Sequence, residues 1–152
     1  MWIGTDGQGL IQLYHYDSLF ETVHTSHPVR CFCEDEDGNI LIGTKGSGIK
    51  LLNPATKELT DYLNESKGLI SNSVYALRRN KANDIFIGTE GTGINILNAA
   101  TGQLEKLEIP DKYPPFKAVY NIYFTNNDSL LWVGTSGYGL IKINISREQG
   151  RY

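Results

Sequence analysis

The chain has little of several features that mark particular classes of protein. Its 152 residues include two cysteines, one methionine and five prolines, and the net charge is −3. Without a surplus of positive charge, we expect neither a nucleic-acid partner nor direct contact with an anionic membrane. The longest apolar stretches, such as NILIG and SLLWVG, are far shorter than the roughly 20 residues that cross a bilayer. No signal peptide precedes the first motif, which favours a cytoplasmic protein or a piece of a longer chain.

The few cysteines and histidines do not form a pattern typical of a metal or redox centre. Cys31 and Cys33 lie two apart in VRCFCED, which has the composition of a strand. On a strand both thiols point to the same face, with poor geometry for a mutual disulfide. We expect both to be small core residues. His15, His24 and His27 lack the regular spacing of a zinc site and are expected on the surface or in loops, so neither a metal nor a cofactor is predicted.

What the sequence does contain is a glycine-rich motif that occurs four times. A large apolar residue and Ile or Val are followed by Gly-Thr-x-Gly-x-Gly and then Leu or Ile. The copies are WIGTDGQGL, LIGTKGSGI, FIGTEGTGI and WVGTSGYGL, with first glycines Gly4, Gly43, Gly88 and Gly134 at offsets of 39, 45 and 46 residues. A period of about 40 to 50 residues is typical of propeller blades or of helical arrays.

The segments between the motifs favour the propeller. One period contains four short runs rich in β-branched and aromatic residues, at 73–80, 84–90, 93–98 and 103–109. Turn residues separate these runs, as in NKAND and NAATGQL. No segment of helical periodicity is long enough for a packed helix. The sequence therefore predicts an all-β fold, a partial β-propeller of about four blades, each blade a four-stranded sheet.

The strand pattern also predicts how the chain is divided. With strands A to D counted from the propeller axis outward, residues 2–25 form an incomplete blade with strands B to D. Residues 28–63 and 72–109 form complete blades. Residues 117–152 form an incomplete blade with strands A to C and part of a strand D in 147–152. An open arc leaves apolar sheet faces at both ends, so we expect contact with further propeller blades or self-association, including a dimer that closes the ring.

The glycines of the motif invite a second interpretation, a phosphate-binding loop. Such a loop runs from a strand through the glycines into a helix, and a Walker loop also needs Gly-Lys followed by Ser or Thr. Here each copy runs into another strand. Gly4, Gly7 and Gly9 are therefore interpreted as positions of positive φ or close backbone approach in the hairpin between strands B and C.

The motif and its surroundings resemble the two-component regulator propeller repeat. The resemblance rests on the four motif copies, on EDEDGN before the second and NPATKEL after it, and on KGLISNSVYAL leading into an inner strand. Such repeats occur in sensor regions of hybrid two-component histidine kinases of Bacteroidetes type. The resemblance implies a periplasmic ligand-sensing module of a membrane-anchored receptor, commonly responding to glycans, with no catalytic residues of its own and with the kinase outside this chain.

Candidate ligand-binding residues occur on the inner strands. Arg30, Tyr75 and Tyr120 occupy equivalent positions in the three copies of strand A and should share one environment. Arginine and tyrosine suit hydrogen bonding or stacking with a polar ligand such as an oligosaccharide. Equally, these side chains could fill the interfaces between blades.

Further candidates lie in loops at the same end of the propeller. Lys45, Glu90 and Tyr138 are variable residues of the B–C hairpins, where a ligand would meet a different side chain in each blade. Tyr113 and Phe116 belong to the stiff segment PDKYPPFKAV. They could stack on a sugar ring, or they could pack over the next blade.

Two other functions remain open from the sequence. A propeller can serve as a protein-interaction scaffold. It can also act as a glycosidase or lyase, which requires two carboxylates brought together with separated pKa values. The acidic run at 34–37 lies between strands A and B and is interpreted as a solvated turn. We expect no enzyme activity in this chain.

Overall fold

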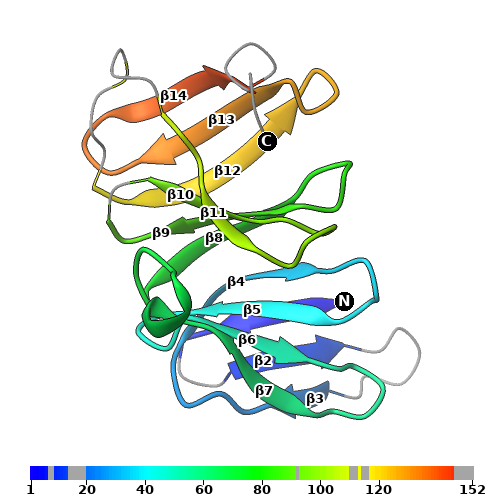
Figure 1. Ribbon diagram of the computed structural model, residues 1–152. Coiled ribbons are helices and arrows are strands. Elements are labelled where there is room, and N and C mark those ends of the chain that lie inside the picture. Colours follow the sequence, from blue (N-terminus) through cyan, green and yellow to red (C-terminus); the bar gives the residue numbers. More distant parts are fainter. Residues whose placement is uncertain (7–8, 14–19, 92, 110–112, 114–116, 146–152) are drawn as a thin grey trace.

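The computed structural model describes the chain except for residues 7–8, 14–19, 92, 110–112, 114–116 and 146–152. The described residues form fourteen strands and one short 3-10 helix, η1 (Glu65–Lys67). The strands build four antiparallel sheets that follow one another along the chain and pack face to face (Figure 1). The prediction of an all-β partial propeller is thereby confirmed.

Each sheet is a meander of neighbouring strands, here called blades 1 to 4. Blade 1 contains β1 (Trp2–Thr5), β2 (Gly9–Leu13) and β3 (Phe20–Val23). Blade 2 contains β4 (Val29–Glu34), β5 (Ile40–Thr44), β6 (Ile49–Leu52) and β7 (Leu59–Leu63). Blade 3 contains β8 (Val74–Arg79), β9 (Ile85–Thr89), β10 (Ile94–Leu97) and β11 (Leu104–Lys106). Blade 4 contains β12 (Val119–Thr125), β13 (Leu130–Thr135) and β14 (Gly139–Asn144). The predicted partial strand at 147–152 lies outside the described residues.

The two middle blades are covered on both faces, which explains their continuous apolar strands. All five residues of β5 and of β9 are buried. In β5, Ile40 and Ile42 pack toward blade 1, whereas Leu41 packs toward blade 3. This division follows from the alternation of side chains across a strand. In β13 of blade 4, by contrast, burial alternates from residue to residue, because the described strands cover only one face of that blade.

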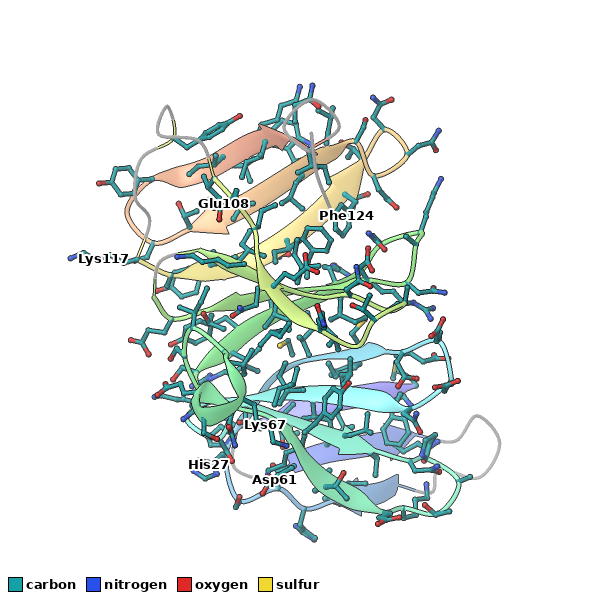
Figure 2. The ribbon with its side chains drawn as sticks, viewed as in Figure 1. His27, Asp61, Lys67, Glu108, Lys117 and Phe124 are labelled. Atoms are coloured by element: carbon teal, nitrogen blue, oxygen red, sulfur yellow. The ribbon has the colours of Figure 1, made fainter. Side chains whose placement is uncertain are left out.

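Three apolar cores lie between successive blades. The core between blades 3 and 4 includes Phe86, Ile122 and Leu131, each fully buried. Phe124, labelled in Figure 2, packs edge-on against Phe86, with ring centroids 4.9 Å apart at an interplanar angle of 86°. Edge-to-face packing of this kind adds about 0.5–1.5 kcal/mol beyond the burial of area. The blades are thus held to one another by apolar contact, while hydrogen bonds hold the strands within each blade.

The turns between strands A and B also connect neighbouring blades. Glu36 Oε2 accepts a hydrogen bond from Asn83 Nδ2 of the next blade at 3.1 Å. Asp35 closes its own turn, because its Oδ1 accepts from the backbone N–H groups of Asp37 and Asn39 at 3.0 and 2.8 Å. The acidic run therefore forms a hairpin turn.

Candidate functional site

Each inner strand begins with a β-bulge, and the bulge sets the direction of one side chain. The pairing register of strand A with strand B skips one residue near the start of β4, β8 and β12. The skipped residues are Arg30, Tyr75 and Tyr120. A bulge interrupts the two-residue alternation and re-aims the side chain at that point. The three residues consequently leave the interfaces between the blades and line one cleft of about 330 Å³.

The two tyrosines of this cleft contact each other. Their rings meet edge to face, with centroids 5.2 Å apart and an interplanar angle of 66°. Tyr120 is 53% exposed, so its ring presents a free surface to the cleft. Burial raises the pKa of the Tyr75 phenol, the negative charge of Glu90 raises that pKa further, and Arg30 acts in the opposite direction. Tyr75 therefore remains a hydroxyl donor at neutral pH, beside the fixed positive charge of Arg30.

Several cleft residues were not singled out from the sequence. Phe32, Arg78 and Asn121 line the same cleft. Arg78 donates from Nε to the carbonyl oxygen of Ile122 at 3.0 Å, which ties its guanidinium to the strand of the next blade. These residues follow the bulges along the same inner strands. The sequence could have identified them, because they belong to the predicted inner strands, but only one residue of each strand was considered as a candidate.

The loop candidates do not line this cleft, although Glu90 lies near enough for its charge to raise the pKa of Tyr75. Lys45 and Glu90 each extend a B strand and form an isolated bridge with the residue before the next inner strand, Ser73 and Ala118 respectively. Tyr138 is 51% exposed in the hairpin of blade 4. Of the described residues that line the cleft around Tyr75, none is one of these three.

The segment between blades 3 and 4 is described only in part. Tyr113 packs against the core between blades 3 and 4, which favours the packing interpretation over stacking on a sugar. Phe116 lies outside the described residues.

The cysteines lie on one face of β4 and pack against the core between blades 2 and 3, in agreement with the sequence. Burial raises the pKa of the Cys31 thiol to about 12. Its Sγ donates to the carbonyl oxygen of Val74 at 3.9 Å. A protonated thiol is a poor nucleophile and a poor metal ligand.

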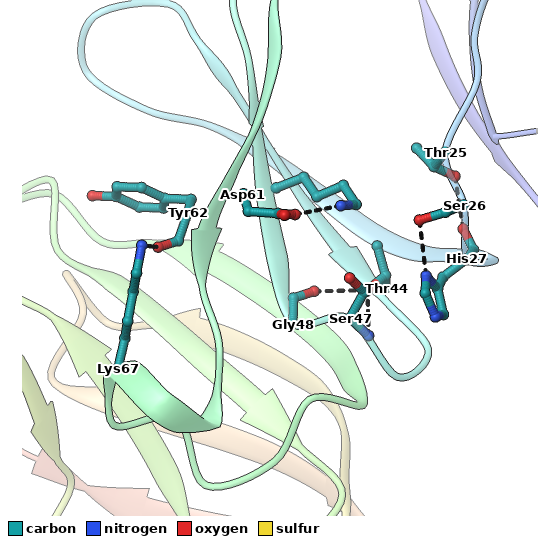
Figure 3. Close-up of polar contacts among 10 residues, drawn as sticks. Thr25, Ser26, His27, Thr44, Ser47, Gly48, Asp61, Tyr62 and Lys67 are labelled. Atoms are coloured by element: carbon teal, nitrogen blue, oxygen red, sulfur yellow. Dashed lines mark hydrogen bonds and ion pairs between the residues drawn. The ribbon is translucent and has the colours of Figure 1, made fainter.

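Two of the three histidines lie in the part of the chain that the structure describes. His27 Nδ1 lies 3.0 Å from Ser26 Oγ in the loop before β4 (Figure 3). His24 is exposed, and His15 lies outside the described residues.

The glycine-rich motif forms a tight hairpin, as predicted. Thr44 Oγ1 donates to the carbonyl oxygen of Gly48 at 2.9 Å and accepts from the backbone N–H of Ser47 at 3.1 Å (Figure 3). Equivalent threonine bonds close the first and fourth hairpins, at Thr5 and Thr135. The last glycine of the motif has positive φ, 69° at Gly48, and a Cβ there would overlap the carbonyl oxygen of Leu63. The last glycine of the motif is thus required by the turn, whereas Gly7 lies outside the described residues.

Residues 25–46 match the two component regulator propeller family. They cover the approach to the first bulged inner strand, the A–B turn, β5 and the beginning of the glycine hairpin. The chain contains a two-component regulator propeller repeat. The resemblance found in the sequence is therefore confirmed. No curated protein matches the chain.

The chain is similar in structure to extracellular domains of putative two-component and one-component systems. The extracellular domain of the putative hybrid two component system BT3049 from B. thetaiotaomicron is 27% identical, with a TM-score of 0.71. That alignment covers 95% of this chain and 18% of the other. The extracellular domain of the putative one component system BT4673 from the same organism is 24% identical over 97% of this chain and 20% of that chain, with a TM-score of 0.77. This propeller therefore spans about a fifth of either relative.

A structure from outside this group shares the fold. The WD40 β-propeller domain of Doa1 is 20% identical, with a TM-score of 0.70, over 93% of this chain and 45% of the other. In the part of this propeller that the structure describes, no helix is both long and apolar enough to traverse a bilayer.

Proposed function

We propose that this propeller is part of the periplasmic ligand-sensing region of a two-component receptor, and that the cleft of Arg30, Tyr75 and Tyr120 contacts a polar ligand such as an oligosaccharide. The observation that carries the proposal is the repeated bulge, which turns the equivalent residue of three successive blades into one cleft. The similarity to extracellular domains of two-component systems supports the compartment and the role.

The chemistry of the cleft suits a carbohydrate. A sugar ring has an apolar face of C–H groups and an equatorial rim of hydroxyl groups. The exposed ring of Tyr120 offers a flat apolar surface, whereas the Tyr75 hydroxyl and the Arg30 guanidinium offer donors. The cleft volume of about 330 Å³ lies at the lower end of the roughly 300–1,000 Å³ typical of ligand sites.

The position of the cleft suggests how binding could be transmitted. Its residues come from the inner strands of blades 2, 3 and 4, so a ligand bound there bridges separate sheets. A ligand shifts a receptor's equilibrium only by as much as it prefers one arrangement over another. A ligand that bridges blades would favour one rigid-body arrangement, which the receptor would relay to a kinase. The chain itself performs no catalysis in this proposal.

Titration calorimetry with a panel of short neutral and acidic oligosaccharides tests the proposal. Tyr120→Ala and Arg30→Gln should weaken the binding of any oligosaccharide that the unmodified chain binds. Tyr123→Ala is the matched control, because Tyr123 lies on the same strand and is 59% exposed but does not line this cleft. Binding that is lost with Tyr123→Ala and kept with Tyr120→Ala would place the site elsewhere. Measuring sugar release from the same panel distinguishes a sensor from a glycosidase, since the proposal expects binding without turnover.

A further inference from the structure

The cleft around Tyr75 contains two arginines, and no acidic residue is among the described residues that line it. Arg30 lies on β4 of blade 2 and Arg78 on β8 of blade 3, and both are exposed. Neither forms an ion pair with another residue in the part of the chain that the structure describes. Although the net charge of the chain is −3, this cleft therefore carries two positive charges with which no described side chain pairs.

A hydrogen bond fixes the orientation of the Arg78 guanidinium. Its Nε donates to the carbonyl oxygen of Ile122, on the inner strand of the next blade, at 3.0 Å. A guanidinium is planar and carries N–H groups on all of its nitrogens, so this bond holds the plane and leaves the N–H groups of Nη1 and Nη2 without a partner among the described residues. Parallel N–H groups at the end of such a fork match the oxygens of a carboxylate. Arg78 is thus oriented in advance for a bidentate contact with an oxyanion.

Arg30 lies near the tyrosines of the cleft, since its charge acts on one of them. Burial and the negative charge of Glu90 raise the pKa of the Tyr75 phenol, whereas Arg30 lowers that pKa. Glu90 is exposed and does not line the cleft, so water and salt screen its charge. Positive charge therefore predominates inside the cleft, beside the tyrosine rings.

A structural role does not account for both arginines. The hydrogen bond to Ile122 gives Arg78 a part in joining blades 3 and 4, but it gives no reason for a second arginine in the same cleft. Like charges in one cleft repel each other, which lowers the stability of the protein without a ligand. An anionic ligand would remove this repulsion, because its negative charge attracts both guanidinium groups.

We propose that the cleft selects an oligosaccharide that carries an oxyanion, either a carboxylate or a sulfate ester, and that Arg78 and Arg30 are the residues that select it. This inference rests on the proposed function, because it names the chemical class of the ligand of the same cleft. Arg78 binds the oxyanion through Nη1 and Nη2, and Arg30 supplies a second positive charge. The Tyr120 ring and the Tyr75 hydroxyl contact the neutral part of the sugar. A neutral oligosaccharide would displace water from both guanidinium groups without supplying a counter-charge, which lowers its affinity.

The two arginines differ in a way that locates the oxyanion. Arg78 also lines a second hollow, of about 570 Å³, together with Tyr123 and Trp132. Arg30 does not line that hollow. An oxyanion bound in the cleft should therefore respond to substitution of either arginine, whereas one bound in the second hollow should respond to Arg78 alone.

Matched pairs of ligands test the inference. Trigalacturonate and its methyl ester have the same rings and linkages and differ in the charge of their carboxyl groups. A sulfated chondroitin disaccharide and its desulfated form provide the same comparison for a sulfate ester. In titration calorimetry with the 152-residue chain, the acidic member of at least one pair should bind about tenfold or more tightly than its less charged partner. A higher salt concentration should reduce this preference, because salt screens exposed charges.

Substitutions on one strand provide the matched control. Arg78→Gln and Arg30→Gln should each remove most of the preference for the acidic ligand. Arg78→Lys should keep only part of it, because lysine has the charge but not the planar fork. Arg79→Gln changes the net charge of the chain by the same amount and should leave the preference unchanged. Arg79 is exposed on the same strand, but it donates to the carbonyl oxygen of Asp35 and does not line the cleft.

Four results would overturn the inference. Neutral ligands that bind as tightly as their acidic partners would leave the proposed function standing without a preference for charge. An equal loss of preference with Arg79→Gln would assign it to the overall charge of the chain. A loss with Arg78→Gln but not with Arg30→Gln would place the oxyanion in the second hollow. If neither these ligands nor the neutral panel binds, the inference fails together with the proposed function.

Discussion

The thiol of Cys31 occupies the place that a side chain on Gly43 would need. A Cβ built on the glycine would overlap Cys31 Sγ, and the valine at the start of blade 3, Val74, closes the same space from the other side. At the equivalent position of blade 3, Ala76 stands where Cys31 stands in blade 2. The repeat therefore tolerates either small side chain there, which makes Cys31→Ala a mild substitution.

Cys31 should make the protein less stable at alkaline pH. Its pKa is raised from an ordinary value of 9.0 to about 12 in the folded chain, chiefly by burial. Between these values the unfolded chain loses the thiol proton first, so stability is complete below pH 9 and falls as the pH rises toward 12. The loss grows as the pH rises through this window and amounts to at most a few kcal/mol.

Urea unfolding of the unmodified chain and of Cys31→Ala between pH 8 and about 11 measures this effect. The alanine variant should show the shallower decline, because it lacks the titrating thiol. Identical pH profiles for the two proteins would contradict the prediction.

Gly88→Ala should be strongly destabilising. The new methyl group would lie 2.6 Å from Val119 Cγ1 and 2.9 Å from the carbonyl oxygen of Val119. Overpacking of a filled interface costs about 1–3 kcal/mol. The free energy of unfolding, measured with urea, gives this cost directly. The Gly88→Ala, Val119→Ala double variant should lose less free energy of unfolding than the sum of the two single losses. Strictly additive losses would show that the two residues do not compete for space.

Substitution by valine should change the stability of the protein differently at two buried threonines of the motif, Thr44 and Thr89. Thr44 donates to Gly48 O and accepts from Ser47 N, whereas the buried Thr89 hydroxyl has no hydrogen-bond partner among the described residues. Thr44→Val leaves the Ser47 N–H without its acceptor, while the Gly48 carbonyl oxygen keeps its hydrogen bond from the Thr44 N–H, and the substitution should cost about 1 kcal/mol. Thr89→Val removes a hydroxyl that has no partner among the described residues and should cost less than Thr44→Val. Thermal and urea unfolding of the pair decide the matter, and equal losses would refute the assigned bonds.

Lys50 and Asp61 form an ion pair (Figure 3). Replacing one member should destabilise the protein by a different amount from replacing the other. The Lys50 side chain is 11% exposed and that of Asp61 is 71% exposed. Asp61→Asn leaves a buried ammonium group without its counter-charge, while Lys50→Met leaves a carboxylate that water solvates. Asp61→Asn should therefore lower the melting temperature more than Lys50→Met.

The same pair predicts a pH dependence at the acid end. A hydrogen bond and the charge of Lys50 hold the pKa of Asp61 below its ordinary value of 3.8. The stabilisation is then complete above pH 3.8 and is lost as the pH falls through the lower folded value. The difference in melting temperature between the unmodified chain and Asp61→Asn should shrink over that range. A difference that stays constant down to the lowest pH would contradict the prediction.

Much of this architecture follows from local pattern. The four motif copies, their spacing and the turn residues between them predict strands and turns, because glycine and asparagine turns and β-branched runs have strong local preferences. Tyr113 shows the limit of such reasoning, since a tyrosine in a loop can cover a core or meet a ligand with the same local sequence. Its place against the core between blades 3 and 4 depends on residues distant in the sequence.

The sequence by itself determined the all-β repeat, the number of strands in each sheet and the structural role of the glycines. Only the tertiary structure decided which side chains meet. The bulges that turn Arg30, Tyr75 and Tyr120 into one cleft arise from the pairing of strand A with strand B, and a change of one residue in register reverses the face of every following side chain. The close approach of Gly88 to Val119 is decided in the same way, because it is a contact between two different sheets.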